Sequence, residues 1–549
     1  MEFKKNQIVE LYIDDIGNEG EGIGHIDGYA LFLKDAVIGD KVRAKIIKTK
    51  KNYGFARVEE VIEASKDRVS PRCSKARQCG GCTLQHLAYE KQLEYKFNKV
   101  KNCLERIGGL ENIEEKMEPI LGMEEPFYYR NKAQFPVGYD KEGNLITGFY
   151  AGRTHHIIDC THCMIQHPVN EQILLKVLDY MKKNNITAYD EKTHKGLVRH
   201  IVTRVGFKTG EIMVCLVVNG SKKNLRNLEM LVDSLIEVEG MTSICVNINK
   251  EKTNRILGSK IEEVYGKPYI YDYIGNVKYQ IGPLSFFQVN PTQTKVLYEK
   301  AMEYADLKGE ETVWDLYCGI GTISLFLAQK AKKVYGVEIV KEAIDDARLN
   351  AKMNGFDNAE FFVGKAEEVL PREYEKNGVY ADTIVVDPPR KGCDSKLLET
   401  MVKMAPKRIV YVSCDPATLA RDLKVLSEQG YEVEKVCAVD QFSHSSHVET
   451  VVLLSQQKPD DTIEIDLDLD ELDATSAELK ATYQEIKDYV LKEFGLKVSN
   501  LYISQVKRKC GIEVGENYNL PKTENPKVLQ CPKEKEDAIK AALKYFAMI

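Results

Sequence analysis

The chain has 549 residues, too many for one hydrophobic core, and its 43% hydrophobic and 29% charged residues are typical of a folded protein with several domains. It has no run of about 18 apolar residues and starts with a charged segment, which excludes a membrane-spanning helix and a secretory signal and predicts a cytoplasmic protein. The net charge of −6 excludes a nucleic-acid site spread over the whole surface, so any such site must be a local patch.

Residues 1–65 read as short strands separated by glycine turns, a pattern that predicts a small OB-like β-barrel. From Lys41 to Arg57 the segment carries seven Lys or Arg residues and no acid, with Tyr53 and Phe55 among them. Basic and aromatic side chains on a barrel suit single-stranded RNA, through backbone charge and base stacking. A solvated hairpin is the alternative interpretation.

Three cysteines, Cys73, Cys79 and Cys82, lie within ten residues, with two glycines between the last two. A chelating loop of this kind needs a fourth ligand, and Cys160 and Cys163 are the candidates. In a cytoplasmic protein, clustered cysteines favour metal binding, catalysis or burial over disulfides. Four thiolates suit an iron–sulfur cluster or a structural zinc, and the spacing alone does not decide between them.

The segment from about residue 115 to 285 alternates strand-like and helical stretches, which predicts an α+β domain. Aromatic residues and arginines recur together along it, a combination suited to phosphate contacts and base stacking. We therefore expect a central domain over residues 66–285, with the cysteine loop and an RNA-binding surface.

From Thr312 onward, strands alternate with helices, which predicts a mostly parallel sheet with helices on both faces and an α/β domain over residues 286–457. The first strand leads into a glycine loop at Gly319 and Gly321, and Glu338 ends the next strand, where an acid can bind a ribose diol. Together with Asp387-Pro-Pro at a later strand end, these residues point to S-adenosylmethionine, with a nicotinamide nucleotide as the alternative.

The apolar run at residues 409–413 ends in Cys414, and Pro416 prevents its continuation as a central strand. Cys414 is therefore expected where a strand opens into a loop, the usual place for a functional residue in an α/β sheet. Taken alone, it would be interpreted as a buried strand-end cysteine. The cofactor motifs around it favour a reactive thiol instead.

These motifs together resemble the RNA uracil-C5 methyltransferases, specifically the branch that acts on 23S ribosomal RNA. The resemblance covers roughly residues 1–455, and its most specific pieces are SFFQVNP (285–291), DLYCGIGT (315–322), VVDPPRKG (385–392), SCDPATLARD (413–422) and FSHSSHVETVVLL (442–454). It implies an amino-terminal TRAM domain, which is an OB-like RNA-binding module, a class I (Rossmann-like) methyltransferase domain and a [4Fe–4S] cluster.

The resemblance also implies roles for single residues. Cys414 is the nucleophile that adds to C6 of uracil, and Glu449 is the base that removes the C5 proton after methyl transfer. The implied cofactor and cluster residues are Gln288, Tyr317, Gly319, Gly321, Thr322, Glu338 and Asp387 for S-adenosylmethionine, and Cys73, Cys79, Cys82 and Cys163 for the cluster. The target nucleotide must leave its stack to reach the thiol.

The implied partner is 23S rRNA, bound by a monomer. Methylation of a tRNA uridine is one alternative function, and a non-catalytic RNA-binding or assembly factor that kept the fold is another. A complete set of Cys414, Glu449 and Asp387 argues against the latter, since binding alone does not use a nucleophile.

The tail lies outside this resemblance. Residues 458–474 are acidic and predict a linker or an added edge strand. Residues 475–549 predict a small helical accessory domain, with Thr475 or Ser476 before its first helix and Gly495 after it. A second helix, capped by Ser499, carries three consecutive basic residues (507–509). This outline fits a helix-turn-helix or a packing module without nucleic acid.

Overall fold

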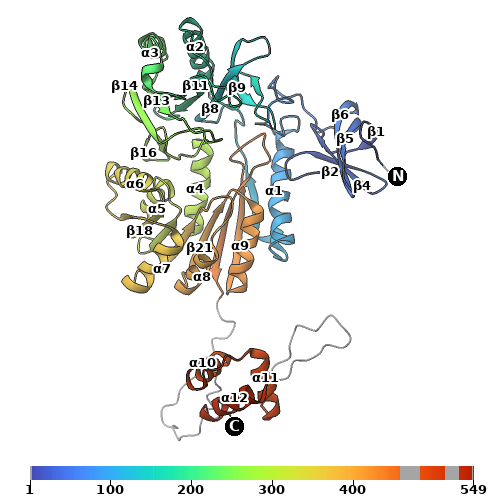
Figure 1. Ribbon diagram of the computed structural model, residues 1–549, viewed down its shortest axis with the longest axis vertical. Helices are drawn as coiled ribbons and strands as arrows, with labels where there is room; N and C mark the ends of the chain where they lie inside the picture. Colours follow the sequence, from blue (N-terminus) through green and yellow to red (C-terminus); the bar gives the residue numbers. More distant parts are fainter. Residues whose placement is uncertain (1–2, 153, 458–481, 513–530, 547, 549) are drawn as a thin grey trace. The chain divides into compact units, whose positions relative to one another are not determined.

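The computed structural model describes residues 3–152, 154–457, 482–512, 531–546 and 548. The chain folds as two compact units, Met1–Lys458 and Pro459–Ile549 (Figure 1). No helix of the described residues is both long and apolar enough to cross a membrane.

The amino-terminal strands form the predicted barrel-like domain, a six-stranded sheet in the order β1-β5-β6-β4-β3-β2. Alternate residues of β5 point inward, so that Val42, Ala44 and Ile46 are fully buried in the core of this domain. The strands are β1 Ile8–Tyr12, β2 Asp15–Ile16, β3 Gly22–Ile26, β4 Tyr29–Lys34, β5 Lys41–Thr49 and β6 Tyr53–Glu63.

The central part holds a seven-stranded sheet in the order β10-β9-β8-β11-β12-β13-β14. Every residue of β11 and β12 is buried, as in the middle of a sheet covered on both faces. The strands are β8 Lys132–Tyr139, β9 Leu145–Tyr150, β10 Ile157–Asp159, β11 Val198–Val205, β12 Ile212–Val218, β13 Met241–Ile248 and β14 Lys260–Gly266. Its helical segments are η1 Ile113–Lys116, α2 Val169–Lys183, η2 Lys222–Asn224 and α3 Leu228–Ile236.

The carboxyl-terminal part of this unit is the expected α/β fold, built on an eight-stranded sheet in the order β19-β18-β17-β20-β21-β23-β22-β7. Its strands run parallel from β19 to β21, and β23 is antiparallel to both of its neighbours. The strands are β7 Met117–Leu121, β17 Thr312–Leu316, β18 Lys333–Glu338, β19 Ala359–Val363, β20 Thr383–Val386, β21 Arg408–Ser413, β22 Tyr431–Val439 and β23 Glu449–Gln456.

Helices cover both faces of the eight-stranded sheet and give it two separate cores. One face packs against α4 Pro291–Ala305, α5 Thr322–Ala328 and α6 Lys341–Asn354. The other packs against α1 Tyr89–Arg106, α7 Ala366–Asn377, α8 Ser395–Met404 and α9 Pro416–Glu428.

Three segments from the predicted central domain join this α/β fold instead of the central sheet. α1 lies along α9 (Figure 1), and β7 pairs in parallel with β22. The hairpin of β15 Ile270–Ile274 and β16 Val277–Ile281 packs into the core under α4, α5 and α6. Local periodicity predicts that such segments are helix or strand, but it does not say which sheet they complete.

The second unit holds α10 Tyr483–Phe494, α11 Asn500–Lys509 and α12 Lys533–Tyr545, packed around their own apolar core. Thr482 and Glu485 form a capping box at the start of α10, and Gly495 ends it in a left-handed conformation, as predicted. Ser499 caps α11, also as predicted. The first helix thus begins later than expected, and Thr475, Ser476 and the acidic stretch 458–474 lie outside the described residues.

Candidate active site

Four of the predicted site residues meet at one edge of the eight-stranded sheet. Tyr317, Asp387 and Cys414 directly follow β17, β20 and β21, and Glu338 is the last residue of β18. The four strands are parallel neighbours, with Leu316 in register with both Val337 and Val386. Their carboxyl ends therefore open onto the same side, where ligands bind in folds of this type (Figure 1).

Cys414 and Glu449 face each other across two antiparallel strands. Ser413 of β21 pairs with Thr450 of β23, so Cys414 and Glu449 are the next pair outward. Cys414 is half-buried, and Glu449 is buried with 5% of its surface exposed. The sheet thus brings one thiol and one carboxyl together at the ligand edge.

The electrostatics of this pair follow from its enclosure. The pKa of Cys414 is raised to about 11, mainly by burial and also by the carboxyls of Glu449 and Asp387, while Arg390 opposes the shift. The pKa of Glu449 is likewise raised to about 8, mainly by burial and also by Asp387, while Arg390 opposes the shift. Both groups are therefore largely protonated near neutral pH, and a positively charged ligand beside them would favour their ionised forms.

The glycine loop after β17 is shaped for close approach of a ligand. Tyr317, Gly319 and Gly321 have positive φ values of 69°, 55° and 80°. A Cβ built on Gly319 would meet no atom within 4 Å, so the space beside it is open. The backbone N–H of Gly319 donates a hydrogen bond to Glu338 (3.3 Å), whose other carboxylate oxygen accepts one from the N–H of Val340 (2.9 Å). Glu338 is thereby fixed at the mouth of the loop.

Acidic groups surround this loop. Burial raises the pKa of Asp315 to about 7, and Ser324 donates a hydrogen bond to its carboxylate. Burial also raises the pKa of Asp387 to about 7. Two carboxyls that ionise near neutral pH, with Glu449 close by, suit a ligand that carries a positive charge.

Two further residues expected to bind the cofactor have other contacts. Thr322 begins α5; its hydroxyl accepts a hydrogen bond from Tyr298 (2.9 Å) and its carbonyl accepts one from Tyr279 (2.9 Å). Gln288 lies between the β15–β16 hairpin and α4, and its carbonyl accepts a hydrogen bond from the amide of Asn131 (2.9 Å). Thr322 therefore holds the loop in place, and Gln288 lies where the central sheet meets the α/β fold.

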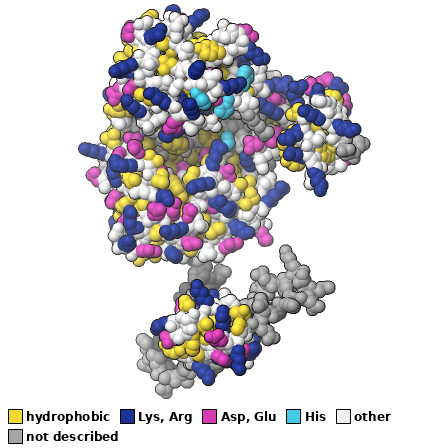
Figure 2. Space-filling view, viewed as in Figure 1, with side chains coloured by type: hydrophobic (Ala, Val, Ile, Leu, Met, Phe, Trp, Pro, Cys, Tyr) yellow, Lys and Arg dark blue, Asp and Glu magenta, His cyan; other side chains and the backbone are white. Residues whose placement is uncertain are grey.

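A cavity of about 510 Å³ extends from Cys414 to the cysteine loop. It is lined by Cys414, Arg390, Phe442 and His447 at one end and by Cys73, Cys79, Cys82, Cys160 and Cys163 at the other. On the face shown in Figure 2, the surface is hollowed between the part that holds β11–β14 and the α/β fold, with Lys, Arg and His side chains along the rim. The predicted nucleophile and the predicted metal ligands thus share one space.

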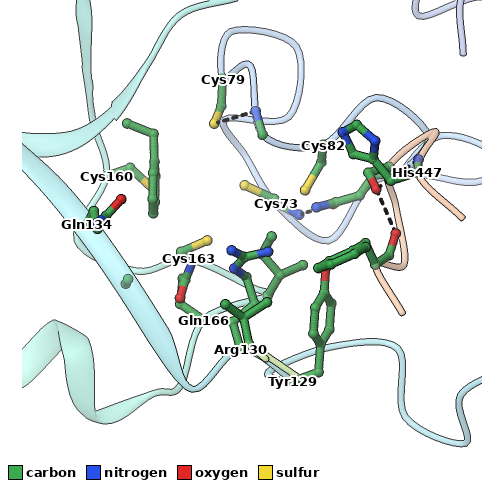
Figure 3. Close-up of a pocket in the computed structure, with 18 of the residues that line it drawn as sticks. Cys73, Cys79, Cys82, Tyr129, Arg130, Gln134, Cys160, Cys163, Gln166 and His447 are labelled. Carbon is green, nitrogen blue, oxygen red and sulfur yellow. Dashed lines mark hydrogen bonds between the residues drawn. The ribbon is translucent and has the colours of Figure 1, made fainter. Parts of the chain in front are cut away.

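The four predicted ligands, Cys73, Cys79, Cys82 and Cys163, turn their side chains toward a common point, three from one loop and the fourth from the segment after β10 (Figure 3). Among the described residues, however, no three or more His, Cys, Asp or Glu side chains form a group that could hold a metal ion. Cys160 is the other candidate, and its thiol donates to the carbonyl of His162 (3.3 Å).

Backbone N–H groups surround these thiols. The N–H of Gly81 donates to the sulfur of Cys79 (3.3 Å). Burial raises the pKa of Cys163 to about 11, and hydrogen bonds from the N–H groups of Ile165 and Gln166 oppose that shift. Donors aimed at sulfur favour the thiolate, the form that binds metal.

The loop before Glu449, residues 440–448, connects this cysteine loop to the active site; we call it the base loop. The carbonyl of His444 accepts hydrogen bonds from the N–H groups of Thr83 (2.8 Å) and Leu84 (3.0 Å), which directly follow Cys82. Phe442 and His447 of the base loop, together with Arg390, line the cavity, although no role was predicted for these three side chains. Their positions inside the DPPRKG and FSHSSHVE motifs could have indicated that they lie at the site.

A buried ion pair anchors the base loop to α1. Lys96 and Asp440 are both fully buried, 2.5 Å apart, and Lys96 also donates to the carbonyl of Phe442 (2.9 Å). Tyr89 donates to the second oxygen of Asp440 (2.7 Å). This network adds polar contacts to the apolar packing of Val100 and Leu104 of α1 against the α/β fold.

We expect Lys96→Met to destabilise the protein by about 3–5 kcal/mol, because it leaves the carboxylate of Asp440 buried without its counter-charge. Urea unfolding of the variant measures the loss. Lys91→Met is the matched control, since Lys91 forms only an exposed pair with Glu94 on the same helix. Equal stability of the two variants would contradict the expectation.

On the amino-terminal domain, Tyr53 and Phe55 pack with Phe32 into an aromatic cluster with ring centroids 5.7–5.8 Å apart. Tyr53 is 40% exposed. Part of the basic segment beside it is neutralised, since Lys41 and Arg43 pair with acids on other strands. The RNA surface predicted from residues 41–57 is therefore narrower than its charge count suggests.

Two family models match the chain. The model described as tRNA (Uracil-5-)-methyltransferase matches residues 88–457, and the TRAM domain model matches residues 2–58.

Close relatives are described more broadly, as RNA methyltransferases. An uncharacterized RNA methyltransferase of Clostridium tetani is 53% identical over 453 residues, which is 82% of this chain and 97% of the relative. One of Bacillus cereus is 50% identical over 454 residues, again 82% of this chain and 97% of the relative. Among solved structures, the Pyrococcus abyssi tRNA (uracil-54, C5)-methyltransferase in complex with S-adenosyl-L-homocysteine matches with a TM-score of 0.66 and 29% identity, over 81% of this chain and all of that one.

Proposed function

Because the chain belongs to the tRNA (uracil-5-)-methyltransferase family and is an RNA uracil-C5 methyltransferase that uses S-adenosylmethionine, we propose that it methylates a uridine of 23S rRNA through a covalent adduct on Cys414. The observation that carries the proposal is the pairing of the Cys414 thiol with the Glu449 carboxyl at the ligand edge of the sheet. Binding without chemistry would use neither group.

The reaction follows from the weak nucleophilicity of uracil C5. The Cys414 thiolate adds to C6, and the electron pair of the C5–C6 bond becomes an enolate. C5 of this enolate attacks the methyl group of the sulfonium, and S-adenosylhomocysteine leaves. Glu449 then takes the proton from C5, the C5–C6 double bond re-forms and the thiolate departs. The balance is one methyl group gained and one proton released.

The positions of the other site residues suggest their roles. Glu338, held by the N–H groups of Gly319 and Val340, would accept hydrogen bonds from the ribose diol. Asp387 would face the positive sulfonium, which favours its ionised form. Gly319 would leave room for the ligand beside the loop, Gly321 would let the loop pack closely on Ala347 and Phe361, and Tyr317 leads into the loop. Gln288 and Thr322 would position the two sides of the pocket.

The division of the chain follows the same proposal. Residues 1–65 and 66–285 would hold the RNA, residues 286–457 would carry the chemistry, and 475–549 would be an accessory domain beyond the acidic stretch 458–474. We expect a monomer that acts in the cytoplasm.

A tRNA substrate is the second candidate. The structure of the Pyrococcus abyssi tRNA (uracil-54, C5)-methyltransferase covers 81% of this chain, a larger share than residues 88–457, which the family model matches. The structural similarity to this tRNA methyltransferase therefore extends beyond the residues that the family model matches, which is the observation that favours a tRNA substrate.

Methyl transfer from tritiated S-adenosylmethionine to unmodified 23S rRNA and to unmodified tRNA, followed by mass mapping of the product, separates the two. We expect 5-methyluridine in 23S rRNA. Labelling of tRNA alone would replace the rRNA assignment, and labelling of neither would refute the enzyme assignment.

We also propose that Cys73, Cys79, Cys82 and Cys163 hold a [4Fe–4S] cluster, supported by the common direction of the four side chains and the N–H donors around them. A cluster held there would brace the loop that donates two hydrogen bonds to the base loop. Methyl transfer moves no net electrons, so we give the cluster no catalytic step.

We expect iron and sulfide, each near four per chain, in protein purified without oxygen. Cys82→Ser should lose most of the iron, whereas Cys160→Ser should keep it, because Cys160 already bonds a backbone carbonyl. One zinc and no iron would refute the cluster, and iron loss in Cys160→Ser but not in Cys163→Ser would exchange the fourth ligand.

We expect the rate at which methylated RNA is released from Cys414 in a single turnover to rise with pH between 6 and 8, by up to about tenfold per unit, because Glu449 accepts the C5 proton only when ionised. The pKa of Glu449 is raised to about 8, so the ionised fraction grows through that range and levels off above it. Ionisation of Cys414 affects the earlier addition step and not the release of the product. Rapid-quench measurement on bound RNA tests this, and a flat profile from pH 6 to 8 would contradict it.

A further inference from the structure

The cavity that contains Cys414 carries an unbalanced charge. Among the described residues that line it are four cations, Lys75, Arg130, Lys132 and Arg390, and no Asp or Glu. Arg390 lies at the end near Cys414, where it influences the thiol and Glu449. Arg130 and Lys132 form a second group, on the wall supplied by the central sheet.

Lys132 is an isolated, mostly buried cation. The pKa of Lys132 is lowered to about 7, mainly by burial and also by the nearby positive charges of Arg204 and Arg130. Arg204 is its register partner on the neighbouring strand, with 2% of its surface exposed. Arg204 donates to the carbonyl of Ser285, yet its Nε has no hydrogen-bond partner among the described residues. Two adjacent buried cations without a carboxylate destabilise the free protein.

Arg130 is oriented by its neighbours. The side chain points into the cavity (Figure 3). With its amide turned to satisfy both partners, Gln166 accepts a hydrogen bond from Nε of Arg130 (3.3 Å). The terminal N–H groups of the guanidinium are then available for a planar anion.

We propose that Arg130 and Lys132, backed by Arg204, form a seat for one phosphate of the RNA strand next to the flipped uridine. The inference rests on the proposed function, since it names how the strand is held while its base reaches Cys414. A cavity rich in cations and free of acids fits a phosphodiester, and phosphate contacts fix the register of a nucleic acid.

The competing explanation is that these cations offset the charge of the cysteine site. Arg130 and Lys132 do line the same cavity as the cysteines. Lys132, however, lies in β8 beside Arg204 of β11, and among the described residues no carboxylate pairs with it. A phosphate of the RNA strand would supply this missing counter-charge, and the iron content of the variants below distinguishes the two explanations.

The test measures binding of a labelled 15-nucleotide oligouridine to the full chain, with S-adenosylhomocysteine present, at several KCl concentrations. Lys132→Met should weaken binding on the order of tenfold at low salt and reduce the slope of log affinity against log salt by about 0.7, the loss of one phosphate contact on a single strand. Lys132→Arg should keep the slope. Lys182→Met, an exposed lysine on α2, is the control for charge and should leave it unchanged.

Two more readouts separate the alternatives. Thermal unfolding of Lys132→Met should occur at the same or a higher temperature, because like charges no longer crowd, whereas a structural lysine would lower it. Iron content should be unchanged. An unchanged salt slope in Lys132→Met overturns the proposal, whether or not iron is lost. The binding measurement needs no turnover. Failure to methylate any RNA would therefore refute the proposed function, but the salt slope would still show whether Lys132 binds a phosphate.

Discussion

Cys414→Ala is expected to lower the rate of methyl transfer by about 10⁴-fold or more, because without addition to C6 the C5 carbon of uracil does not attack a methyl sulfonium. The same variant should form no covalent complex with RNA that contains 5-fluorouridine, whereas wild type should form one that survives denaturing electrophoresis. Binding of S-adenosylhomocysteine should be retained, since Asp387, Glu338 and the glycine loop are intact.

Cys103→Ala is the matched control, because Cys103 is a half-buried thiol on α1 that does not line the cavity. Equal transfer by wild type and Cys414→Ala would remove the nucleophile from Cys414 and with it the covalent mechanism. Slow transfer with a normal covalent complex would instead place the defect after addition.

Glu449→Gln is expected to stop the reaction at a later point. Addition and methyl transfer need no base at C5, but release does, so methylated RNA should accumulate on Cys414 with about one methyl group per chain. Steady-state turnover should fall by about 10²–10⁴-fold. Denaturing gels with labelled methyl groups measure both the trapped complex and the missing turnover.

Glu428→Gln, at the exposed end of α9, makes the same chemical change away from the cavity and should turn over normally. If Glu449→Gln releases its product at the wild-type rate, another group removes the C5 proton. Asp387 would then be the first to examine, since it influences both Cys414 and Glu449.

The architecture followed closely from local patterns. Strands ending at Leu316, Val386 and Ser413 could be located from apolar runs stopped by Gly or Pro, and parallel order then brings Tyr317, Asp387 and Cys414 to one edge. The match to the TRAM family model confirms the predicted TRAM domain, and the similarity to a solved methyltransferase structure confirms the predicted methyltransferase fold. The roles of the individual site residues stay predictions.

Contacts between distant segments were not predictable. Lys96 and Asp440 are 344 residues apart, and nothing local marks a lysine on an amphipathic helix for complete burial. The same holds for the hydrogen bonds from Thr83 and Leu84 to His444, and for the meeting of Arg130 and Lys132 with Arg390 in one cavity. Charge counts also misled, since Lys41 and Arg43 are neutralised by acids from other strands.

Strand β7 has a consequence for biosynthesis and for modularity. Met117 pairs with Val436, so the outer strand of the eight-stranded sheet leaves the ribosome long before the neighbour it covers. The amino-terminal domain and the central sheet can fold during this time, but β7 stays unpaired until β22 has been synthesised. A shortened chain starting at residue 286 would leave one side of β22 unpaired, and such an edge recruits other chains. The α/β fold of this protein is therefore not complete without residues from the amino-terminal half of the chain. A chimera that joins it to a different amino-terminal domain has to keep β7 and α1.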